Sequence, residues 1–349
     1  MHKCEAKCAA IGRALEEIVV RARSGKKICH LGLMAAGSEL PIKEFLFAAQ
    51  TSMDADPGLR ITAIGPLPEE PLPEGMDWVE TVNCDADAAK AMENLLSEGK
   101  IDGAVALHYP FPMGVTTVGR IIRPATGLPM YMASCTGMSA SKRAESMLRN
   151  AILGAGVARA LGVSLPILGI LNLDAAAQVA KALSRMIERG YPIKLGTSIR
   201  HDGGVLLRGN DVLCGTFDVC VTDTLTGNVL MKLLSSFTSG GARETCGWGY
   251  GPSVGKGWNR VVSIVSRASS APVIAGALLY TAQSVRRHLP QRIQEEFTIA
   301  RDAGLDLEIY TLNNYNTNIQ EITPPSVTPV NTEIYGIDVL ELENAVYCL

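Results

Sequence analysis

The sequence is poor in aromatic residues and has no strong excess of either charge. Phe, Tyr and Trp make up 5% of the 349 residues, and the formal net charge is -3 at pH 7. No basic run is present, so nothing in the sequence suggests nucleic acid as a partner. Few aromatics beside 34 glycines favour close packing of helices on a sheet over an aromatic-rich β-sandwich.

Long uncharged apolar runs are also missing. No stretch of about 18 such residues occurs, so we expect no transmembrane helix. Residues 1–18 carry Lys, Glu and Arg among their apolar residues, which predicts an amphipathic helix rather than a signal peptide. We therefore expect a cytoplasmic protein.

The nine cysteines are odd in number and scattered. Several of them, such as Cys29 and Cys220, fall in apolar strand-like runs, which indicates reduced thiols rather than a disulfide framework. Cys4 and Cys8 have no His or Cys pair at metal spacing elsewhere in the chain. We interpret these two as neighbours on one helix face and expect no metal site.

Several catalytic motifs are absent. No G-x-G-x-x-G follows the first predicted strand, and neither a G-x-S-x-G elbow nor an H-E-x-x-H pair occurs. This argues against a nicotinamide enzyme of the usual kind, a serine hydrolase of that fold and a zinc peptidase. The glycine-dense segment 240–257 is not a P-loop, because Tyr250 stands where that motif needs Gly and Gly257 where it needs Ser or Thr. We expect it to be a mobile loop over the substrate or a plain connector.

Predicted strands and helices alternate along the chain. Strands are expected at 27–33, 60–64, 78–82, 101–107, 128–133, 165–171, 217–222 and 260–265. Helices are expected through 45–47 and at 85–97, 139–161, 174–188, 226–237 and 271–288, with Asp174 as a cap. Apolar strands alternating with helices predict an α/β fold of mainly parallel sheets covered by helices on both faces.

The length of the chain predicts two α/β lobes. We expect the first lobe to hold residues 1–138 and about 260–320, and the second to hold residues 139–259. Residues 321–332 are rich in Pro and Thr, which indicates a linker. Residues 333–349 are interpreted as the start of a C-terminal module that is cut short, with a docked tail as the alternative.

The most informative segment is the turn from Asp223 to Asn228. A buried strand leads into it, Gly227 allows a close backbone approach, and a helix begins at once. The free N–H groups and positive dipole end of that helix predict an anion site. The alternative is an ordinary helix capped by Thr226. Lys232, on the same helix, is interpreted either as an aid to the anion or as a side chain reaching to water.

Two further segments supply candidate ligands. Thr116 and Thr117 follow a predicted strand, and the guanidinium of Arg123 suits a phosphate or carboxylate. His108 is expected to be a packed histidine, and Arg120 is expected to pair with a surface acid. From the glycine-dense segment we include Ser253 and Lys256 as ligands. Its cysteine, Cys246, is a candidate nucleophile, with a packing role as the default interpretation.

These segments resemble a known family. Leu168-Gly-Ile-Leu-Asn172 and the run from Asp218 to Lys232 are similar to the PlsX-like phosphate acyltransferases of phospholipid synthesis. Thr116-Thr117 with Arg123-Pro124 is similar to the related phosphotransacetylases. The resemblance covers about residues 25–290 and implies a two-lobed isocitrate/isopropylmalate-dehydrogenase-like fold. The usual His-Gly-Ser-Ser signature is missing near Arg267-Ala-Ser-Ser270.

The resemblance implies attack of inorganic phosphate on an acyl thioester, with no cofactor. The residues expected to hold phosphate and substrate are Thr116, Thr117, Arg123, Asn172, Asp223, Thr226, Gly227, Asn228, Ser253 and Lys256.

The N-terminal half and the tail resemble the alpha subunits of component C of glycine/sarcosine/betaine reductase complexes, which act in amino-acid fermentation. That family releases acetyl phosphate from an acetyl thioester and carries a reactive cysteine after a segment similar to residues 336–343. The resemblance therefore implies a catalytic thiol beyond Leu349 or, within the chain, at Cys348.

The same resemblance implies partners. These are an acyl-carrying protein or the ketoacyl-synthase-like beta subunit of component C, and an acetylated selenoprotein as thioester donor; a homo-oligomer is compatible with it. Two alternatives stay open. One is a free-standing phosphate acyltransferase that uses acyl-carrier protein or coenzyme A thioesters, and the other is a catalytically silent scaffold subunit.

Overall fold

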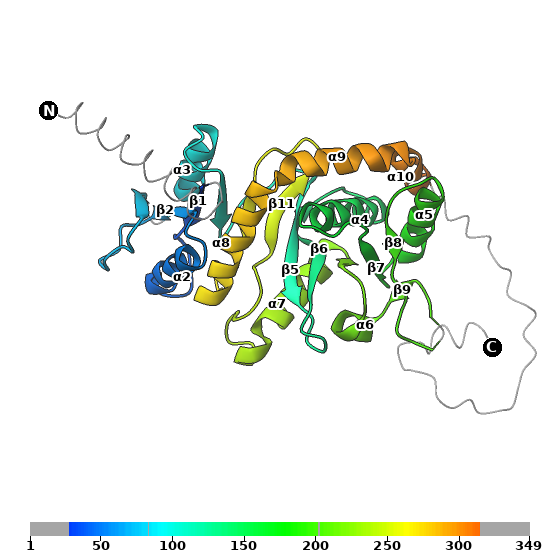
Figure 1. Cartoon of the computed structure of the whole chain (residues 1–349), viewed down its shortest axis with the longest axis horizontal. Coiled ribbons are helices and arrows are strands. Elements are labelled where there is room, and N and C mark those ends of the chain that lie inside the picture. The colour runs from blue at the N-terminus through cyan, green and yellow to red at the C-terminus, as the bar shows by residue number, and fades with distance from the viewer. Residues whose placement is uncertain (1–27, 83, 202, 315–349) are drawn as a thin grey trace, which may run out of the picture. The chain divides into compact units, whose positions relative to one another are not determined.

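The structure is a computed structural model, and it describes residues 28–82, 84–201 and 203–314. Contacts divide the chain into a large compact unit, residues 1–313, and a C-terminal part, residues 314–349 (Figure 1). The expected N-terminal helix, the linker 321–332 and the module 333–349 lie outside the described residues, and so does Cys348.

Five mutually parallel strands form the first half of a large sheet. They are β1 (Cys29–Met34), β2 (Leu59–Gly65), β3 (Met76–Glu80), β4 (Gly103–Ala106) and β12 (Val262–Ile264). Helices α2 (Ile42–Ala55) and α8 (Ala271–Arg286) pack on one face of this half, and α3 (Asp85–Ser97) packs on the other.

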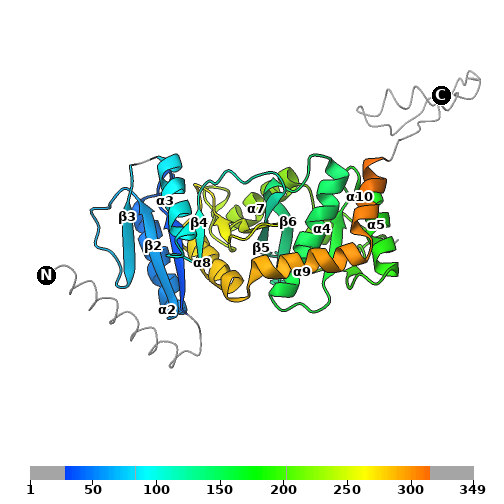
Figure 2. The ribbon, with the colours of Figure 1, turned by 90° about the horizontal axis from the view of Figure 1, so that it is seen from above.

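Five more parallel strands form the second half. They are β6 (Pro129–Met138), β7 (Ile167–Leu171), β8 (Lys194–Leu195), β9 (Leu206–Leu207) and β10 (Val219–Val221). One face is covered by α4 (Arg143–Ala160), α5 (Ala176–Glu188), α9 (Leu289–Asp302) and α10 (Leu305–Asn313), and the other by α7 (Thr224–Ser236). Figure 2 shows α9 beside α4, which it contacts. A short helix, α6 (Gly209–Cys214), precedes β10, and a 3-10 turn, η1 (Phe237–Ser239), follows α7.

Two antiparallel strands, β5 (Val115–Ile122) and β11 (Gly251–Gly255), join the halves. The strand order is β3-β2-β1-β4-β12-β11-β5-β6-β10-β7-β8, and β9 also pairs with β7 (Figure 1). The prediction of an α/β fold with mainly parallel strands and helices on both faces is confirmed. Within the residues that the structure describes, no helix is long and apolar enough to cross a membrane.

Two strands lie in segments for which the sequence predicted no strand. Residues 115–122 form β5, and residues 251–255 of the glycine-dense segment form β11. The glycines hide β11 because Gly251 has φ +85°, a conformation outside the normal strand region. No nucleotide-binding helix follows this segment, because the chain passes directly to β12.

The antiparallel strands bear on the lobe boundaries. The sequence predicts that residues 115–138, which form β5 and β6, belong to the first lobe. However, β6 pairs with β10 of the second half, and β5 pairs with β6. The segments β5 and β6 therefore lie in the half of the sheet that residues 139–259 build. α9 also contacts α4 of that half. We propose that the first lobe ends near residues 107–114 instead of 138, and that its second segment, which begins near residue 260, ends near residues 287–288 instead of 320.

Local sequence explains several helix ends. α3 spans the predicted residues 85–97. Asp85 and Asp87 lie in its first turn, where the positive end of the helix dipole stabilises carboxylates. The predicted cap of α5 is wrong, because Ala175 holds the N-cap position. Asp174 instead forms an ion pair with Arg143 at 2.6 Å.

Candidate functional site

Two neighbouring cavities open beside the carboxyl end of β6. The first has a volume of about 350 Å³ and is lined by Leu107, His108, Tyr109, Phe111, Thr136, Gly137, Asn228, Lys232, Tyr250, Ile264, Val265, Ser266 and Arg267. The second has a volume of about 490 Å³, and its lining includes Ser141, Arg143, Ser146, Asp223, Thr224 and Leu225. Both cavities are lined by Thr136, Gly137 and Asn228. The predicted turn therefore contributes residues to both.

The start of α7 is capped by the chain itself. Asp223 is the N-cap residue, and its Oδ1 accepts a hydrogen bond from the Thr226 N–H at 2.8 Å. The alternative in which Thr226 caps the helix is therefore wrong. Because a carboxylate is already bound at this helix end, the N–H of Thr226 is not available to a phosphate. Thr224 Oγ1 lies 2.8 Å from Ser134 Oγ, which ties the turn to β6.

Gly227 is required by packing. A Cβ atom at this position would overlap the carbonyl oxygen of Ser134, so α7 lies against β6 more closely than any side chain allows. Asn228 follows, and its Nδ2 donates a hydrogen bond to the carbonyl oxygen of Cys135 at 3.1 Å. The close approach of α7 thus places Asn228 directly over the end of β6, between the two cavities.

Lys232 lies one turn further along α7 and lines the first cavity. Its Nζ is 3.6 Å from Glu244 Oε1 and 5.4 Å from the centre of the Tyr250 ring. The sequence left open whether Lys232 faces an anion or water. The side chain is 54% exposed, so its ammonium group is accessible from the cavity. On its other side the ammonium group pairs with the carboxylate of Glu244.

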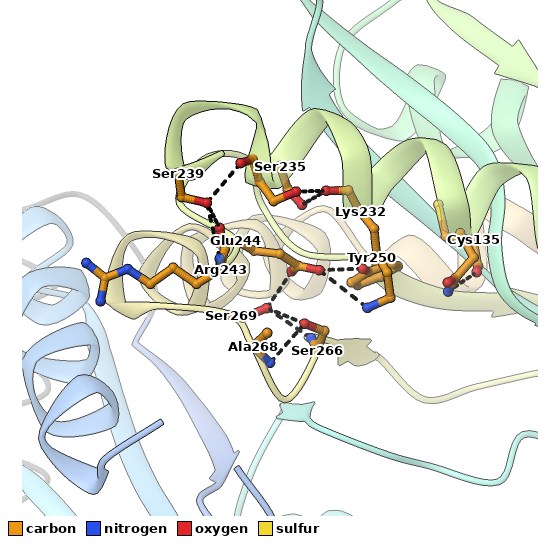
Figure 3. A network of polar contacts seen from close by, with 12 residues as sticks. Cys135, Lys232, Ser235, Ser239, Arg243, Glu244, Tyr250, Ser266, Ala268 and Ser269 are labelled. Atoms are coloured by element: carbon orange, nitrogen blue, oxygen red, sulfur yellow. Dashed lines mark hydrogen bonds and ion pairs between the residues drawn. The ribbon is translucent and has the colours of Figure 1, made fainter. Parts of the chain in front are cut away.

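Glu244 organises the wall behind Lys232 (Figure 3). It is buried, and its carboxylate accepts hydrogen bonds from the Tyr250 hydroxyl at 2.5 Å and the Ser269 hydroxyl at 2.7 Å. Burial, and then the charge of Glu244, raise the pKa of Tyr250 well above its usual value. The contacts join the glycine-dense segment to the loop after β12, which carries Ser266.

That loop and the end of β4 complete the first cavity. Arg267 pairs with Asp85 of α3 at 3.0 Å and is about half exposed. His108, which the sequence suggested was packed, is exposed and lines the cavity. Sequence reasoning missed Glu244, Tyr250 and Arg267 as contributors. A carboxylate within a glycine-rich segment was the one signal that could have drawn attention to Glu244.

Thr116 and Thr117 lie behind the cavity wall. Both are fully buried, and neither lines either of the two cavities. Thr116 Oγ1 donates to the carbonyl oxygen of Thr136 at 2.6 Å, and Thr117 Oγ1 lies 2.9 Å from Thr136 Oγ1. The two predicted ligands therefore position Thr136, which lines both cavities, instead of facing a ligand themselves.

Arg123 is not brought to the turn. It is buried, donates hydrogen bonds to the carbonyl oxygens of Gly215 and Pro129, and lies over the Phe217 ring at 5.6 Å. Desolvation lowers the pKa of Arg123, opposed by the nearby charge of Asp218. Since β5 runs antiparallel to β6, Ile122 pairs with Pro129, roughly 25 Å along β6 from Gly137 at 3.3 Å per residue.

Three other expected ligands also lie away from the cavities. Asn172 follows β7, and its N–H donates to the Leu207 carbonyl oxygen. Ser253 is buried in β11, where its hydroxyl accepts from Trp258 Nε1 at 2.8 Å and from the Val262 N–H at 3.0 Å. Lys256 is exposed in the turn after β11. None of the three lines either cavity.

The cysteines near the site are not activated. Burial raises the pKa of Cys135, and raises that of Cys220 to about 12. Cys246 has a raised pKa from burial and from the charge of Glu244, and its Sγ lies 3.3 Å from the Leu234 carbonyl oxygen. A nucleophilic cysteine needs a lowered pKa, so none of these three is suited to the role. No group of three or more His, Cys, Asp or Glu side chains within the described part of the chain could hold a metal.

Comparison with known proteins identifies relatives of this chain. A family model described as "fatty acid synthesis protein" matches residues 29–329. The "glycine/sarcosine/betaine reductase complex component C subunit alpha" of Peptoclostridium acidaminophilum is 40% identical over 341 residues, covering 96% of this chain and 87% of that protein. A phosphate acyltransferase of Thermotoga neapolitana is 30% identical over 190 residues, covering 46% of this chain and 55% of the relative.

A solved structure shares the fold. The branched-chain phosphotransacylase of Enterococcus faecalis superposes with a TM-score of 0.51 at 16% identity, over 73% of this chain and 99% of that one. The chain therefore belongs to the PlsX-like phosphate acyltransferase family and, within it, groups with the alpha subunits of component C of glycine/sarcosine/betaine reductase complexes. The family resemblance read from the sequence is confirmed.

Proposed function

We propose that this chain transfers an acyl group from a thioester to inorganic phosphate, and that acetyl phosphate is the product within a glycine reductase-type complex. The observation that carries the proposal is the first cavity, where Lys232 and Asn228 of α7 face Ser266 and Arg267 of the loop after β12. Membership of an acyltransferase family supports the acyl transfer, and the name of the component C relative supports a place in a glycine reductase-type complex.

The reaction needs little covalent chemistry from the protein. A phosphate oxygen attacks the carbonyl carbon of the thioester, and the C–S bond then breaks with its electron pair leaving on sulfur. Lys232 and Arg267 reduce the charge of the phosphate so that it can approach the carbonyl. The side chains of Asn228 and Thr136 supply hydrogen bonds to the oxyanion that forms on the carbonyl oxygen. The imidazole of His108 accepts the proton that the attacking hydrogen phosphate loses and passes it to the departing thiolate, so that His108 is unchanged at the end of the reaction.

The acyl group comes to the cavity on a thiol of another molecule. Of the cysteines near the cavities, Cys135, Cys220 and Cys246 all have raised pKa values. The proposed donor is therefore an acyl-carrying protein or the beta subunit of component C, with inorganic phosphate as co-substrate and no cofactor. A Cys348→Ala chain assayed beside the wild type tests whether that cysteine carries the acyl group.

The test measures acetyl phosphate made from phosphate and three acetyl thioesters: acetyl coenzyme A, an acetylated carrier protein, and the acetylated beta subunit. The product is trapped with hydroxylamine and quantified, and arsenate-dependent loss of acetyl phosphate measures the reverse direction. Activity that needs the beta subunit supports the component C function, while activity with coenzyme A or the carrier alone supports a free-standing acyltransferase. No activity in any arm, in either direction, contradicts the proposal and favours a scaffold subunit.

A further inference from the structure

Three aromatic side chains gather at one end of the first cavity, and we call Tyr109, Phe111 and Trp258 the aromatic wall. Tyr109 and Phe111 line the cavity, and the centres of their rings are 5.0 Å apart. Trp258 lies behind Phe111, with the two ring centres 6.2 Å apart and the ring planes at 85°. Tilted and edge-on contacts of this kind are favoured between aromatic rings. Phe111 is therefore packed between two other rings.

Hydrogen bonds fix the two outer members of the aromatic wall. The Tyr109 hydroxyl donates to Glu93 Oε1 of α3 at 2.7 Å, and Trp258 Nε1 donates to Ser253 Oγ of β11 at 2.8 Å. Each of these rings is thus tied to a regular element of the fold, and Phe111 packs between them. Because a well-packed wall resists an inserted group, it does not move aside at low cost for a longer ligand.

The groups that line the cavity follow a fixed order along β11. Directly before the strand, the Tyr250 N–H donates to the Ile264 carbonyl oxygen at 2.8 Å, and the Tyr250 ring lies 5.4 Å from Lys232 Nζ. Directly after it, the Trp258 N–H donates to the Gly255 carbonyl oxygen at 3.2 Å. The strand itself is about 13 Å long at 3.3 Å per residue. The ammonium group and the aromatic wall therefore lie at opposite ends of the cavity.

Thr136 lies between these two ends. Its Oγ1 is 2.9 Å from Thr117 Oγ1, and Thr117 pairs with Ser253, the middle residue of β11. Thr136 and Asn228 both line the cavity. The order along the cavity is therefore an ammonium group, hydrogen-bond donors and the aromatic wall. An acyl phosphate carries its groups in the matching order, which is phosphate, carbonyl and acyl chain.

We propose that the aromatic wall restricts the acyl group to a short chain, and that Phe111 is the residue that determines this specificity. The inference rests on the acyl transfer proposed above, because the phosphate at Lys232 and the carbonyl at Thr136 orient the ligand. In that orientation the acyl chain points at Phe111 and ends against its ring. Each added methylene then overlaps a ring that its two neighbours hold in place.

The volume of the cavity supports the same restriction. A ligand needs roughly 30 Å³ for each non-hydrogen atom, which is the share of one water molecule in the liquid. Acetyl phosphate then needs about 240 Å³, and the cavity of about 350 Å³ holds it. Hexanoyl phosphate, at about 360 Å³, exceeds the cavity slightly, and a 16-carbon acyl phosphate, at about 660 Å³, exceeds it almost twofold.

The first experiment measures binding of acetylphosphonate and hexanoylphosphonate, stable analogues of the acyl phosphates, to the full chain by titration calorimetry. The wild type is expected to bind the hexanoyl analogue at least about 30-fold more weakly, since a pocket too short by one methylene already rejects a ligand about 10-fold or more. In Phe111→Ala this difference should fall below about threefold. Phe111→Leu, a smaller change, should give an intermediate difference. Phe47→Ala is the matched control and should keep the wild-type difference, because Phe47 is 66% exposed on α2.

The second experiment compares kcat/KM for acetyl and hexanoyl thioesters on the same donor. Phe111→Ala should raise the hexanoyl to acetyl ratio at least about 10-fold over the wild type. A wild type that binds both analogues equally or binds neither contradicts the inference, and so does an unchanged preference in both Phe111 variants. Selective binding of acetylphosphonate without acyl transfer from any thioester supports the role of Phe111 and contradicts the proposed function instead.

Discussion

Polar side chains that lie beside the two ends of strand β6 have different tasks. At the carboxyl end, Thr136 and Gly137 line both cavities beside Asn228. At the amino end, Arg123 is buried and bonded to backbone carbonyl oxygens. The residue types at the two ends look equally suited to bind phosphate in the sequence. The difference lies in their partners: polar groups whose partners are supplied by the fold are structural, and those that face a cavity are available to a ligand.

The largest expected effect comes from Gly227→Ala. Its new methyl group would overlap the Ser134 carbonyl oxygen, so α7 must move away from β6, and we expect a loss of about 3 kcal/mol or more in the free energy of unfolding. Urea denaturation of the variant measures this. Gly204→Ala is the control, since open space surrounds that position and its unfolding free energy should change by about 0.5 kcal/mol at most.

Arg123→Ala is expected to lower the free energy of unfolding by about 2–3 kcal/mol. The Gly215 carbonyl oxygen loses its donor and the packing on Phe217 is lost, and a buried acceptor without a partner carries a cost of this size. Acyl transfer per folded molecule should stay within about twofold of the wild type, because no group at the cavity changes. A stable Arg123→Ala protein with greatly reduced acyl transfer would instead show that Arg123 contributes to phosphate binding.

Thr117→Val tests the layer behind the cavity. The isosteric change removes the hydrogen bond with Thr136 Oγ1 and should lower the free energy of unfolding by about 1 kcal/mol. Acyl transfer should fall only a few-fold, because Thr136 is still held by Thr116. The comparison uses Thr311→Val, an exposed position on α10. A 100-fold loss of activity in Thr117→Val would mean that Thr117 contacts the substrate directly.

The smallest expected effect is that of Cys246→Ala, which should leave acyl transfer within about twofold of the wild type. Burial and Glu244 raise the pKa of this thiol, so the thiolate forms only at higher pH than for an ordinary cysteine. Alkylation of Cys246 by iodoacetamide, followed by mass spectrometry, should therefore begin at higher pH than alkylation of a model thiol. Fast alkylation at neutral pH together with loss of activity would support the hypothesis that Cys246 is a nucleophile.

Local features of the fold could be predicted from the sequence. The acidic first turn and Gly99 bound α3, and the strand before Asp223 leads directly into α7. Strand direction could not be predicted, because Thr116 and Thr117 occur in β5 with no signal that β5 is antiparallel. That direction carries Arg123 away from the turn while it brings Thr116 close to Thr136.

The site was predicted only in part for a related reason. Asn228 follows from the turn motif, but the wall of the first cavity depends on contacts between distant segments. Glu244 accepts a hydrogen bond from Ser269, and Arg267 pairs with Asp85. Such pairs carry no local pattern, because each residue is an ordinary loop or helix residue in its own segment.

The most direct test of the account compares Lys232 with Lys256, the lysine that the sequence predicted as a ligand. Lys232 lines the first cavity, whereas Lys256 is exposed in the turn after β11 and lines neither cavity. Initial rates of acetyl phosphate formation against phosphate concentration are measured for Lys232→Ala and Lys256→Ala. We predict a loss of about 100-fold in kcat/KM for phosphate in Lys232→Ala and a change of less than about twofold in Lys256→Ala. The reverse ranking of the two variants would contradict the placement of phosphate in this cavity.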